Sequence, residues 1–106
     1  MAETFLYLTT MGRKTAKPHQ IEIWFVEHAG CYFLCSELYE KADWIQNSLN
    51  TPEVSFYIAE RGQDVPAKNG IASVVENEAT IAILKQKFDA KYDWSKGLFL
   101  QICVGD

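Results

Sequence analysis

A cluster of positive charge stands out in a chain whose formal net charge is −4. It lies in the segment 8–19, which reads L-T-T-M-G-R-K-T-A-K-P-H and contains Arg13, Lys14 and Lys17. Gly12 and Pro18 break the strand-like runs on either side, so we expect a hairpin turn here. Its cations and exposed backbone N–H groups could bind a phosphate or a carboxylate, with His19 as a further donor. The alternative is a solvated hairpin tip whose charges prevent edge-to-edge pairing of strands.

A second candidate anion site lies where a strand is predicted to end and a helix to begin. The strand ends at Ser36, and the helix starts within a few residues. Free N–H groups and the helix macrodipole favour anions at such a position. Lys41 in the first turn would add a positive charge. The alternative is an amphipathic helix with Lys41 in solvent and Asp43 placed to stabilise the helix N-terminus.

Several aromatic side chains could line an apolar slot for a planar ligand, although aromatic residues commonly belong to the core. They are Trp24, Tyr32, Trp44, Tyr57 and Trp94. Glu22 is unusual because it lies between two isoleucines, on the same strand face as Trp24. Its carboxylate is expected to face solvent, a partner subunit or a ligand.

The sequence shows no nucleophile–base pair and no familiar metal motif. Neither C-x-x-C nor H-E-x-x-H occurs, and no serine or cysteine has a nearby His–Asp arrangement. The three cysteines are expected to be reduced, small apolar residues, because their number is odd and no secretory signal is apparent. They are Cys31, Cys35 and Cys103. If the protein is an enzyme, an organic cofactor is therefore expected to carry the chemistry.

A series of short strands and two helices is predicted to position these residues. Period-two alternation and strand-forming residues predict strands over 4–10, 19–27, 31–37, 54–59, 65–75 and 98–104. Three- and four-residue spacing predicts a helix over 39–50 that buries Ala42, Ile45 and Leu49. Asn77 is expected to cap a second helix that runs to about Tyr92. Hairpin connections dominate, so we expect six mostly antiparallel strands in a small barrel whose openings are covered by helices.

Length and composition limit the class of protein. The 106 residues are expected to form a single domain, 1–106. The acidic balance argues against nucleic acid as a general partner. No apolar run approaches the roughly 20 residues needed to cross a bilayer. The first residues lack the features of a signal peptide, so the expected location is cytoplasmic.

Two blocks of sequence resemble the flavin/deazaflavin oxidoreductase superfamily. The segment 8–19, followed by I-E-I-W-F-V, is similar to the family pattern L-T-T-x-G-R-K-S-G-K-P-R followed by a strand. The later block A-D-W-I-Q-N-S-L-N-T-P-E-V is similar to A-x-W-x-x-N-L-x-x-N-P-x-V. The closest match is the deazaflavin-dependent nitroreductase family. FMN proteins similar to pyridoxamine 5′-phosphate oxidase share its fold, the split β-barrel.

The resemblance implies a six-stranded antiparallel split β-barrel that forms a homodimer, with FMN or a deazaflavin (coenzyme F-420) near the subunit interface. The cofactor-binding residues that it implies are Lys14, Lys17, His19, Ser36, Lys41, Ala42, Trp44 and Asn47. His19 stands where relatives often carry arginine, which is a stronger bidentate partner for phosphate. Ala16 stands where glycine is usual, so the turn would be strained if its φ is positive.

The function that the resemblance implies is hydride transfer from a reduced deazaflavin or flavin to a small acceptor, such as a quinone, an enone or a nitro compound. Two alternatives remain open at this point. The chain could bind or carry the cofactor without turnover. It could also keep the barrel only as a dimerisation or interaction domain. The sequence assigns no catalytic residue and no proton donor.

Overall fold

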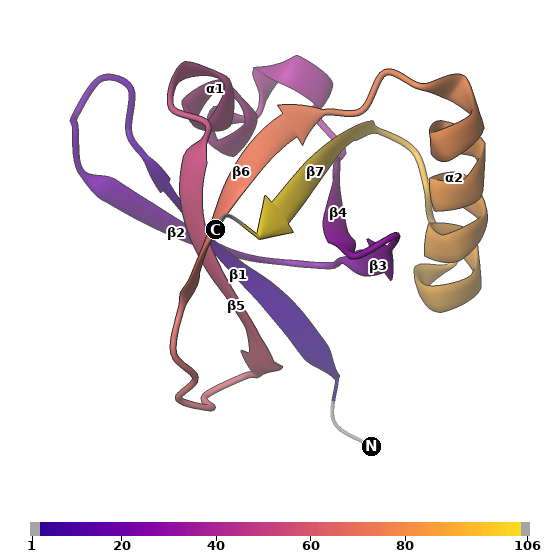
Figure 1. Cartoon of the computed structure of the whole chain (residues 1–106), viewed down its shortest axis with the longest axis horizontal. Coiled ribbons are helices and arrows are strands. Elements are labelled where there is room, and N and C mark those ends of the chain that lie inside the picture. The colour runs from indigo at the N-terminus through magenta and orange to yellow at the C-terminus, as the bar shows by residue number, and fades with distance from the viewer. Residues whose placement is uncertain (1–2, 105–106) are drawn as a thin grey trace.

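Strands form most of the secondary structure in the computed structural model, which describes residues 3–104 (Figure 1). The strands are β1 (Thr4–Met11), β2 (Pro18–Ile23), β3 (Val26–His28), β4 (Cys31–Ser36), β5 (Glu53–Glu60), β6 (Lys68–Val74) and β7 (Leu98–Val104). The helices are α1 (Asp43–Asn50), α2 (Glu78–Tyr92) and the short 3-10 helix η1 (Tyr39–Lys41).

A single antiparallel sheet contains all the strands of the described chain, in the order β2-β1-β5-β6-β7-β4-β3. Its two edge strands, β2 and β3, follow each other in sequence with only Trp24 and Phe25 between them. Three residues of chain span at most about 11 Å, so the sheet must curl until its edges approach each other. Figure 1 shows the resulting half-barrel, with α1 at one end and α2 beside β3 and β4. The predicted fold class is confirmed.

The strand count differs from the prediction, because the strand expected over 19–27 is divided at Phe25. The Phe25 N–H donates to the Tyr92 hydroxyl at 3.1 Å. The Phe25 carbonyl accepts hydrogen bonds from the Tyr92 hydroxyl at 3.0 Å and from the Lys91 ammonium at 2.9 Å. The end of α2 thus satisfies both backbone groups that a neighbouring strand would otherwise bind. The described sheet therefore has seven strands rather than six.

The helix predicted over 39–50 is in fact η1 followed by α1, separated by Ala42, whose backbone is extended. The prediction that Leu49 is buried is wrong, because its side chain is 48% exposed. Asn47 and Ser48 are buried instead. The inward face of α1 is therefore set in part by the hydrogen bonds of Asn47, which are described below, and not by the apolar stripe alone.

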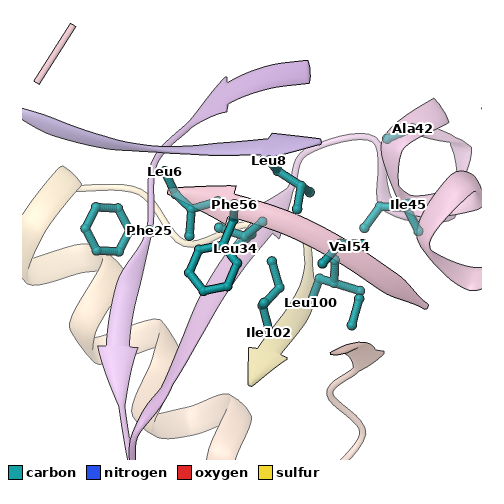
Figure 2. Close-up of a cluster of buried hydrophobic side chains, with 11 residues drawn as sticks. Leu6, Leu8, Phe25, Leu34, Ala42, Ile45, Val54, Phe56, Leu100 and Ile102 are labelled. Carbon is teal, nitrogen blue, oxygen red and sulfur yellow. The ribbon is translucent and has the colours of Figure 1, made fainter. Parts of the chain in front are cut away.

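Two apolar clusters lie on opposite sides of the sheet. The larger one fills the inside of the half-barrel next to α1 (Figure 2) and consists of Leu6, Leu8, Phe25, Leu34, Ala42, Ile45, Val54, Phe56, Ala72, Leu100 and Ile102. The second lies between the sheet and α2 and consists of Val26, Phe33, Cys35, Val75, Leu84, Phe88 and Phe99. Because β4 contributes to both clusters, both of its faces are buried, as its continuous apolar sequence predicts.

The helix α2 begins and ends where the sequence predicts. The side-chain oxygen of Asn77 accepts a hydrogen bond from the Thr80 N–H at 2.9 Å, which is the expected N-cap interaction. The helix ends at Tyr92, and the following Asp93 adopts a left-handed conformation with φ of 56°. No helix of the described chain has both the length and the apolar character needed to cross a membrane.

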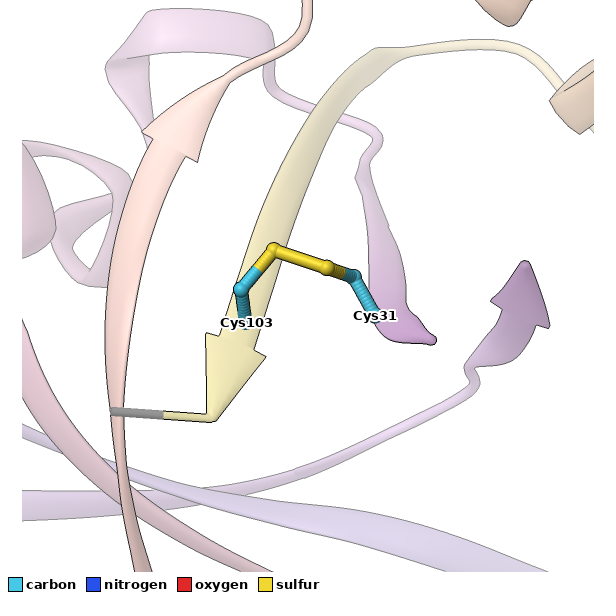
Figure 3. The surroundings of a disulfide bond; sticks show 2 residues. All are labelled: Cys31 and Cys103. Atoms are coloured by element: carbon cyan, nitrogen blue, oxygen red, sulfur yellow. A yellow bond between two sulfur atoms is a disulfide. The ribbon is translucent and has the colours of Figure 1, made fainter. Parts of the chain in front are cut away.

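The expectation of three reduced cysteines is wrong for two of them. Cys31 and Cys103 form a disulfide bond between the start of β4 and the end of β7, with their Cα atoms 4.5 Å apart (Figure 3). The register that pairs Tyr32 with Ile102 places the two cysteines side by side. Cys35 is buried and free, and burial raises the pKa of its thiol to about 12. This thiol therefore stays protonated and weakly nucleophilic at neutral pH.

Candidate functional site

The hairpin between β1 and β2 is folded against α1 and does not project freely into solvent. The side-chain oxygen of Asn47 accepts hydrogen bonds from the backbone N–H and the guanidinium of Arg13, at 3.2 and 3.0 Å. The Asn47 amide group also donates to the Thr10 hydroxyl at 3.3 Å. Arg13 forms an ion pair with Asp43 at 3.3 Å. The cationic turn and the start of α1, which the sequence presents as separate candidates, are therefore neighbours.

The turn itself is closed by two backbone hydrogen bonds. The Gly12 N–H donates to the Lys17 carbonyl at 2.8 Å, and the Ala16 N–H donates to the Gly12 carbonyl at 2.9 Å. Ala16 has φ of 56°, the left-handed conformation that costs a residue with a Cβ about 1–2 kcal/mol. A Cβ at Gly12 would collide with the side chains of Thr15 and His19. Glycine there leaves room for the Thr15 hydroxyl to lie 3.1 Å from His19 Nε2.

An open cleft of about 630 Å³, which we call the hairpin cleft, lies between this turn and α1. Most of the residues implied by the resemblance line it, namely Lys14, His19, Ala42, Trp44 and Asn47. Arg13 and Asp43 also line it, so two cations face one carboxylate. The hairpin cleft therefore carries one uncompensated positive charge when its histidine is neutral. This charge and the adjacent polar groups suit the binding of an anion.

The other implied residues lie outside the hairpin cleft. Ser36 is buried, and its hydroxyl donates to the Tyr39 carbonyl at 2.9 Å. Lys17 and Lys41 are exposed, and neither lines the hairpin cleft. Lys41 belongs to η1 and not, as predicted, to the first turn of the α-helix. The structure thus gathers five of the eight residues at one place and leaves both of these lysines at the surface.

A second cleft of about 530 Å³ lies next to the hairpin cleft, and we call it the aromatic cleft. The two clefts share Leu38, Ala42 and Trp44 as lining residues, and we refer to the two adjoining clefts together as the groove. The other residues that line the aromatic cleft include Phe5, Glu22, Trp24, Ser36, Glu37, Arg61 and Trp94. Each volume falls within the range of small-molecule sites, about 300–1,000 Å³.

The predicted aromatic slot is divided between two places. Three of its members line the aromatic cleft: Trp24, Trp44 and Trp94. The other two, Tyr32 and Tyr57, line a separate pocket of about 350 Å³. Trp24 stacks on Tyr92, with ring centroids 4.5 Å apart and an interplanar angle of 5°. Trp94 meets Trp24 edge to face at 6.5 Å. The end of α2 therefore holds the indole of Trp24 in a fixed orientation.

Glu22 is held by two neighbours on the same face of the sheet. Its carboxylate accepts a hydrogen bond from the Tyr7 hydroxyl at 2.8 Å and two from Arg61, at 3.1 and 2.6 Å. The hydrogen bond from Arg61, followed by that from Tyr7, lowers the pKa of Glu22, because both donors stabilise the ionised carboxylate. The hydrogen bond to Glu22 raises the pKa of Tyr7, which keeps its hydroxyl protonated.

Sequence reasoning singled out Glu22 but missed Arg61. Arg61 directly follows β5 in a polar turn, where a charged residue carries no special signal. It reaches Glu22 because β1 pairs with β2 on one side and with β5 on the other. Only this strand order, which is not visible in a single sequence, brings an arginine beside a carboxylate 39 positions earlier.

Solved structures identify the fold as the split β-barrel of the proteins similar to pyridoxamine 5′-phosphate oxidase. A candidate pyridoxamine 5′-phosphate oxidase from Listeria innocua is 17% identical over 96% of this chain and 84% of its own, with a TM-score of 0.73. The heme storage protein HutZ from Vibrio cholerae is 18% identical, with coverages of 96% and 82% and a TM-score of 0.70. An F420 reductase is 12% identical, with coverages of 96% and 86% and a TM-score of 0.65.

Family membership follows from the sequence itself. The model of the family described as F420H(2)-dependent quinone reductase matches residues 1–93, so the chain belongs to this family. The predicted relationship to deazaflavin oxidoreductases is thereby confirmed. No match was found among curated protein sequences.

Proposed function

We propose that this chain is an oxidoreductase that uses a reduced deazaflavin, coenzyme F-420, to transfer a hydride to a small acceptor such as a quinone, an enone or a nitro compound. The observation that carries the proposal is the pair of adjoining clefts in a member of the quinone reductase family. One end of the groove is cationic and the other is aromatic. An elongated cofactor with its anionic tail at the cationic end would place its planar ring where the two clefts adjoin, next to the aromatic end. FMN, which also combines a ring with a phosphate, is the alternative cofactor.

The hairpin cleft is the proposed site of the phosphate-bearing tail. Lys14 and His19 line it and are the donors we assign to the phosphate. Arg13 is already bound to Asp43 and Asn47, so its role is to hold the hairpin in place. The exposed residues Lys17 and Lys41 are assigned a weaker role, in which they attract the tail from the margin of the cleft.

The cofactor ring is assigned to the shared part of the groove, beside Leu38, Ala42 and Trp44. Ser36 lines the adjoining aromatic cleft, and its hydroxyl oxygen retains acceptor capacity after donating to Tyr39. The bound deazaflavin supplies the hydride. The contribution of the chain is to bind the tail, orient the ring and exclude water from the apolar part of the groove.

Titration of the purified protein with coenzyme F-420 and, in parallel, with FMN tests the proposal. Binding is followed by the change in cofactor fluorescence, and turnover is followed by the loss of reduced cofactor in the presence of menadione. We expect a dissociation constant for F-420 well below 100 μM. If neither cofactor binds below this concentration, which corresponds to about 5.5 kcal/mol, the proposed function is wrong. Binding without turnover across quinones and nitro compounds would support a carrier role instead.

Substitution Lys14→Ala is expected to weaken cofactor binding without changing the fold. Loss of one charge-assisted hydrogen bond costs about 1.5–3 kcal/mol, roughly a 10- to 100-fold rise in the dissociation constant. Lys41→Ala is expected to have a smaller effect of the same sign, because Lys41 lies outside both clefts. Fluorescence titration measures both constants. Lys85→Ala, on the exposed face of α2, is the matched control and should bind like the unmodified protein.

The proposal includes the homodimer and the cytoplasmic location expected from the sequence. Large apolar side chains that remain exposed in the isolated chain support an interface between copies, among them Met11 at 41% and Ile71 at 47%. We expect sedimentation velocity to show one species of twice the chain mass at micromolar concentration. A Met11→Glu/Ile71→Glu variant that stays folded should shift this species toward the monomer. A monomer in the unmodified protein at all concentrations would contradict the dimer.

A further inference from the structure

The groove is electrically polarised along its length. The hairpin cleft has the cations Arg13 and Lys14 against the carboxylate of Asp43. The aromatic cleft has the carboxylates Glu22 and Glu37 against the guanidinium of Arg61. One end therefore carries an uncompensated positive charge and the other an uncompensated negative charge. An anion is favoured at the first end and disfavoured at the second.

The aromatic cleft also offers a fixed surface for a planar ring. Trp24 remains 39% exposed, although Tyr92 covers one face of its indole. The neighbouring residue Phe25 is tied to the end of α2 by three hydrogen bonds, which fixes the backbone that carries Trp24. The exposed part of this rigid indole can contact an apolar ring at little cost in side-chain entropy.

Arg61 also lines the aromatic cleft and has N–H groups that Glu22 does not bind. Glu22 binds its Nε and Nη2 groups, and the guanidinium lies 5.1 Å from the centre of the Phe5 ring. A guanidinium has five N–H groups, so the Nη1 hydrogens are not used by Glu22. These can donate to a carbonyl oxygen. Because Glu22 already neutralises the arginine, the cleft has no surplus positive charge with which to hold a full anion.

We propose that the aromatic cleft is the acceptor site and that it selects neutral planar carbonyl compounds over anionic ones. The acceptor ring stacks on Trp24, a carbonyl oxygen accepts a hydrogen bond from Arg61, and Glu37 repels acceptors that carry a negative charge. This inference rests on the proposed function. A hydride brings two electrons and one proton to a quinone and gives the hydroquinone monoanion, while the deazaflavin is oxidised. A second proton, from water, completes the hydroquinone.

Two naphthoquinones test the selection directly. Menadione is neutral, whereas its hydroxylated analogue lawsone is an anion at neutral pH. Quenching of tryptophan fluorescence measures the dissociation constant of each compound on the full chain, with and without bound cofactor. We expect menadione to bind about threefold more tightly than lawsone at low ionic strength, the size of one exposed charge interaction. Added salt should reduce the ratio of the lawsone dissociation constant to the menadione dissociation constant, because the repulsion is electrostatic. Equal affinities, or tighter binding of lawsone, would overturn the proposal.

Variants separate the contributions of the individual groups. Glu37→Gln should lower the lawsone-to-menadione ratio of dissociation constants by about threefold, the size of an exposed charge interaction. Glu53→Gln, an exposed carboxylate outside the aromatic cleft, is the matched control and should leave the ratio unchanged. Trp24→Ala should weaken binding of both naphthoquinones and remove part of the quenching signal. A Glu37→Gln ratio equal to that of the control would contradict the role of Glu37.

The role of Arg61 is tested with a double variant, because removal of Arg61 alone would leave the Glu22 carboxylate without its ion-pair partner. The double variant Glu22→Gln/Arg61→Met removes both charges and should bind menadione several-fold more weakly, with an unchanged dissociation constant for F-420. Unchanged menadione affinity in this variant would contradict the role of Arg61. Failure of the unmodified protein to bind F-420 would instead contradict the proposed function. The two outcomes are therefore distinguished by the ligand concerned, which is menadione for this inference and F-420 for the proposed function.

Discussion

Reduction of the Cys31–Cys103 disulfide is expected to lower the free energy of unfolding by about 4 kcal/mol. The two cysteines are 72 positions apart, and a cross-link of this span removes much of the conformational entropy of the unfolded chain. For a domain of about 100 residues each kcal/mol corresponds to roughly 4–8 °C in Tm. Urea denaturation and thermal melting, with and without a reducing agent, measure the difference. The transition of the reduced protein should fall by roughly 15–30 °C.

The controls for this prediction use the third cysteine. The variant Cys31→Ala/Cys103→Ala should unfold like the reduced protein and should not respond to the reducing agent. In the oxidised protein, Cys35 is buried with a raised pKa of about 12, so a thiol reagent should modify it only after unfolding. Identical denaturation curves for the oxidised and reduced protein would contradict the stabilising role of the bond. Three reactive thiols in the untreated protein after denaturation would contradict the bond itself.

Substitution Asn47→Ala is expected to impair both stability and cofactor binding. The buried amide binds the Arg13 backbone, the Arg13 guanidinium and the Thr10 hydroxyl. A buried partner left without a hydrogen bond costs about 1–3 kcal/mol, and Thr10 is such a partner, so we expect a loss of about 1–3 kcal/mol in the free energy of unfolding. The hairpin carries Lys14 and His19, and its release should raise the F-420 dissociation constant at least tenfold.

Urea denaturation and fluorescence titration of the same variant separate the two effects of Asn47→Ala. Asn47→Asp keeps an oxygen acceptor for Arg13 and should retain more of the affinity than Asn47→Ala. Asn50→Ala, near the end of the same helix but exposed, is the matched control and should behave like the unmodified protein. A folded Asn47→Ala protein with unchanged F-420 affinity would show that hairpin docking does not shape the binding site.

Local patterns predicted the elements that are stabilised by local interactions. The strand-forming residues of β1 and β7, the alternation in β5 and the cap at Asn77 depend on residues close in sequence, and the structure contains these elements where they were expected. The strand expected over 31–37 is also present, as β4. The cationic turn was also found, because Gly12 and Pro18 mark its ends in the sequence.

The predictions that failed depend on contacts between distant residues. The division between β2 and β3 follows from hydrogen bonds between Phe25 and residues 66 and 67 positions later. Leu49 is exposed because the hydrogen bonds between Asn47 and the hairpin help to set which face of α1 points inward. The spacing of the apolar residues alone does not decide this orientation. The disulfide requires β4 and β7 to be neighbours, which only the sheet order establishes. Five of the eight residues that the resemblance implies line the hairpin cleft, but neither the second cleft nor the contribution of Arg61 to it could be predicted from the sequence.

The attachment of Phe25 to the end of α2 has a consequence for the order of folding. During synthesis, β2 and β3 emerge long before Lys91 and Tyr92, the residues that hold the bend between them. Until α2 forms, both edge strands can pair with other chains. Closure of the half-barrel is thus a late, long-range event, which predicts slow folding for a chain of this size. Chains truncated before Tyr92 should accumulate in insoluble aggregates, whereas the 106-residue chain can form the curled sheet.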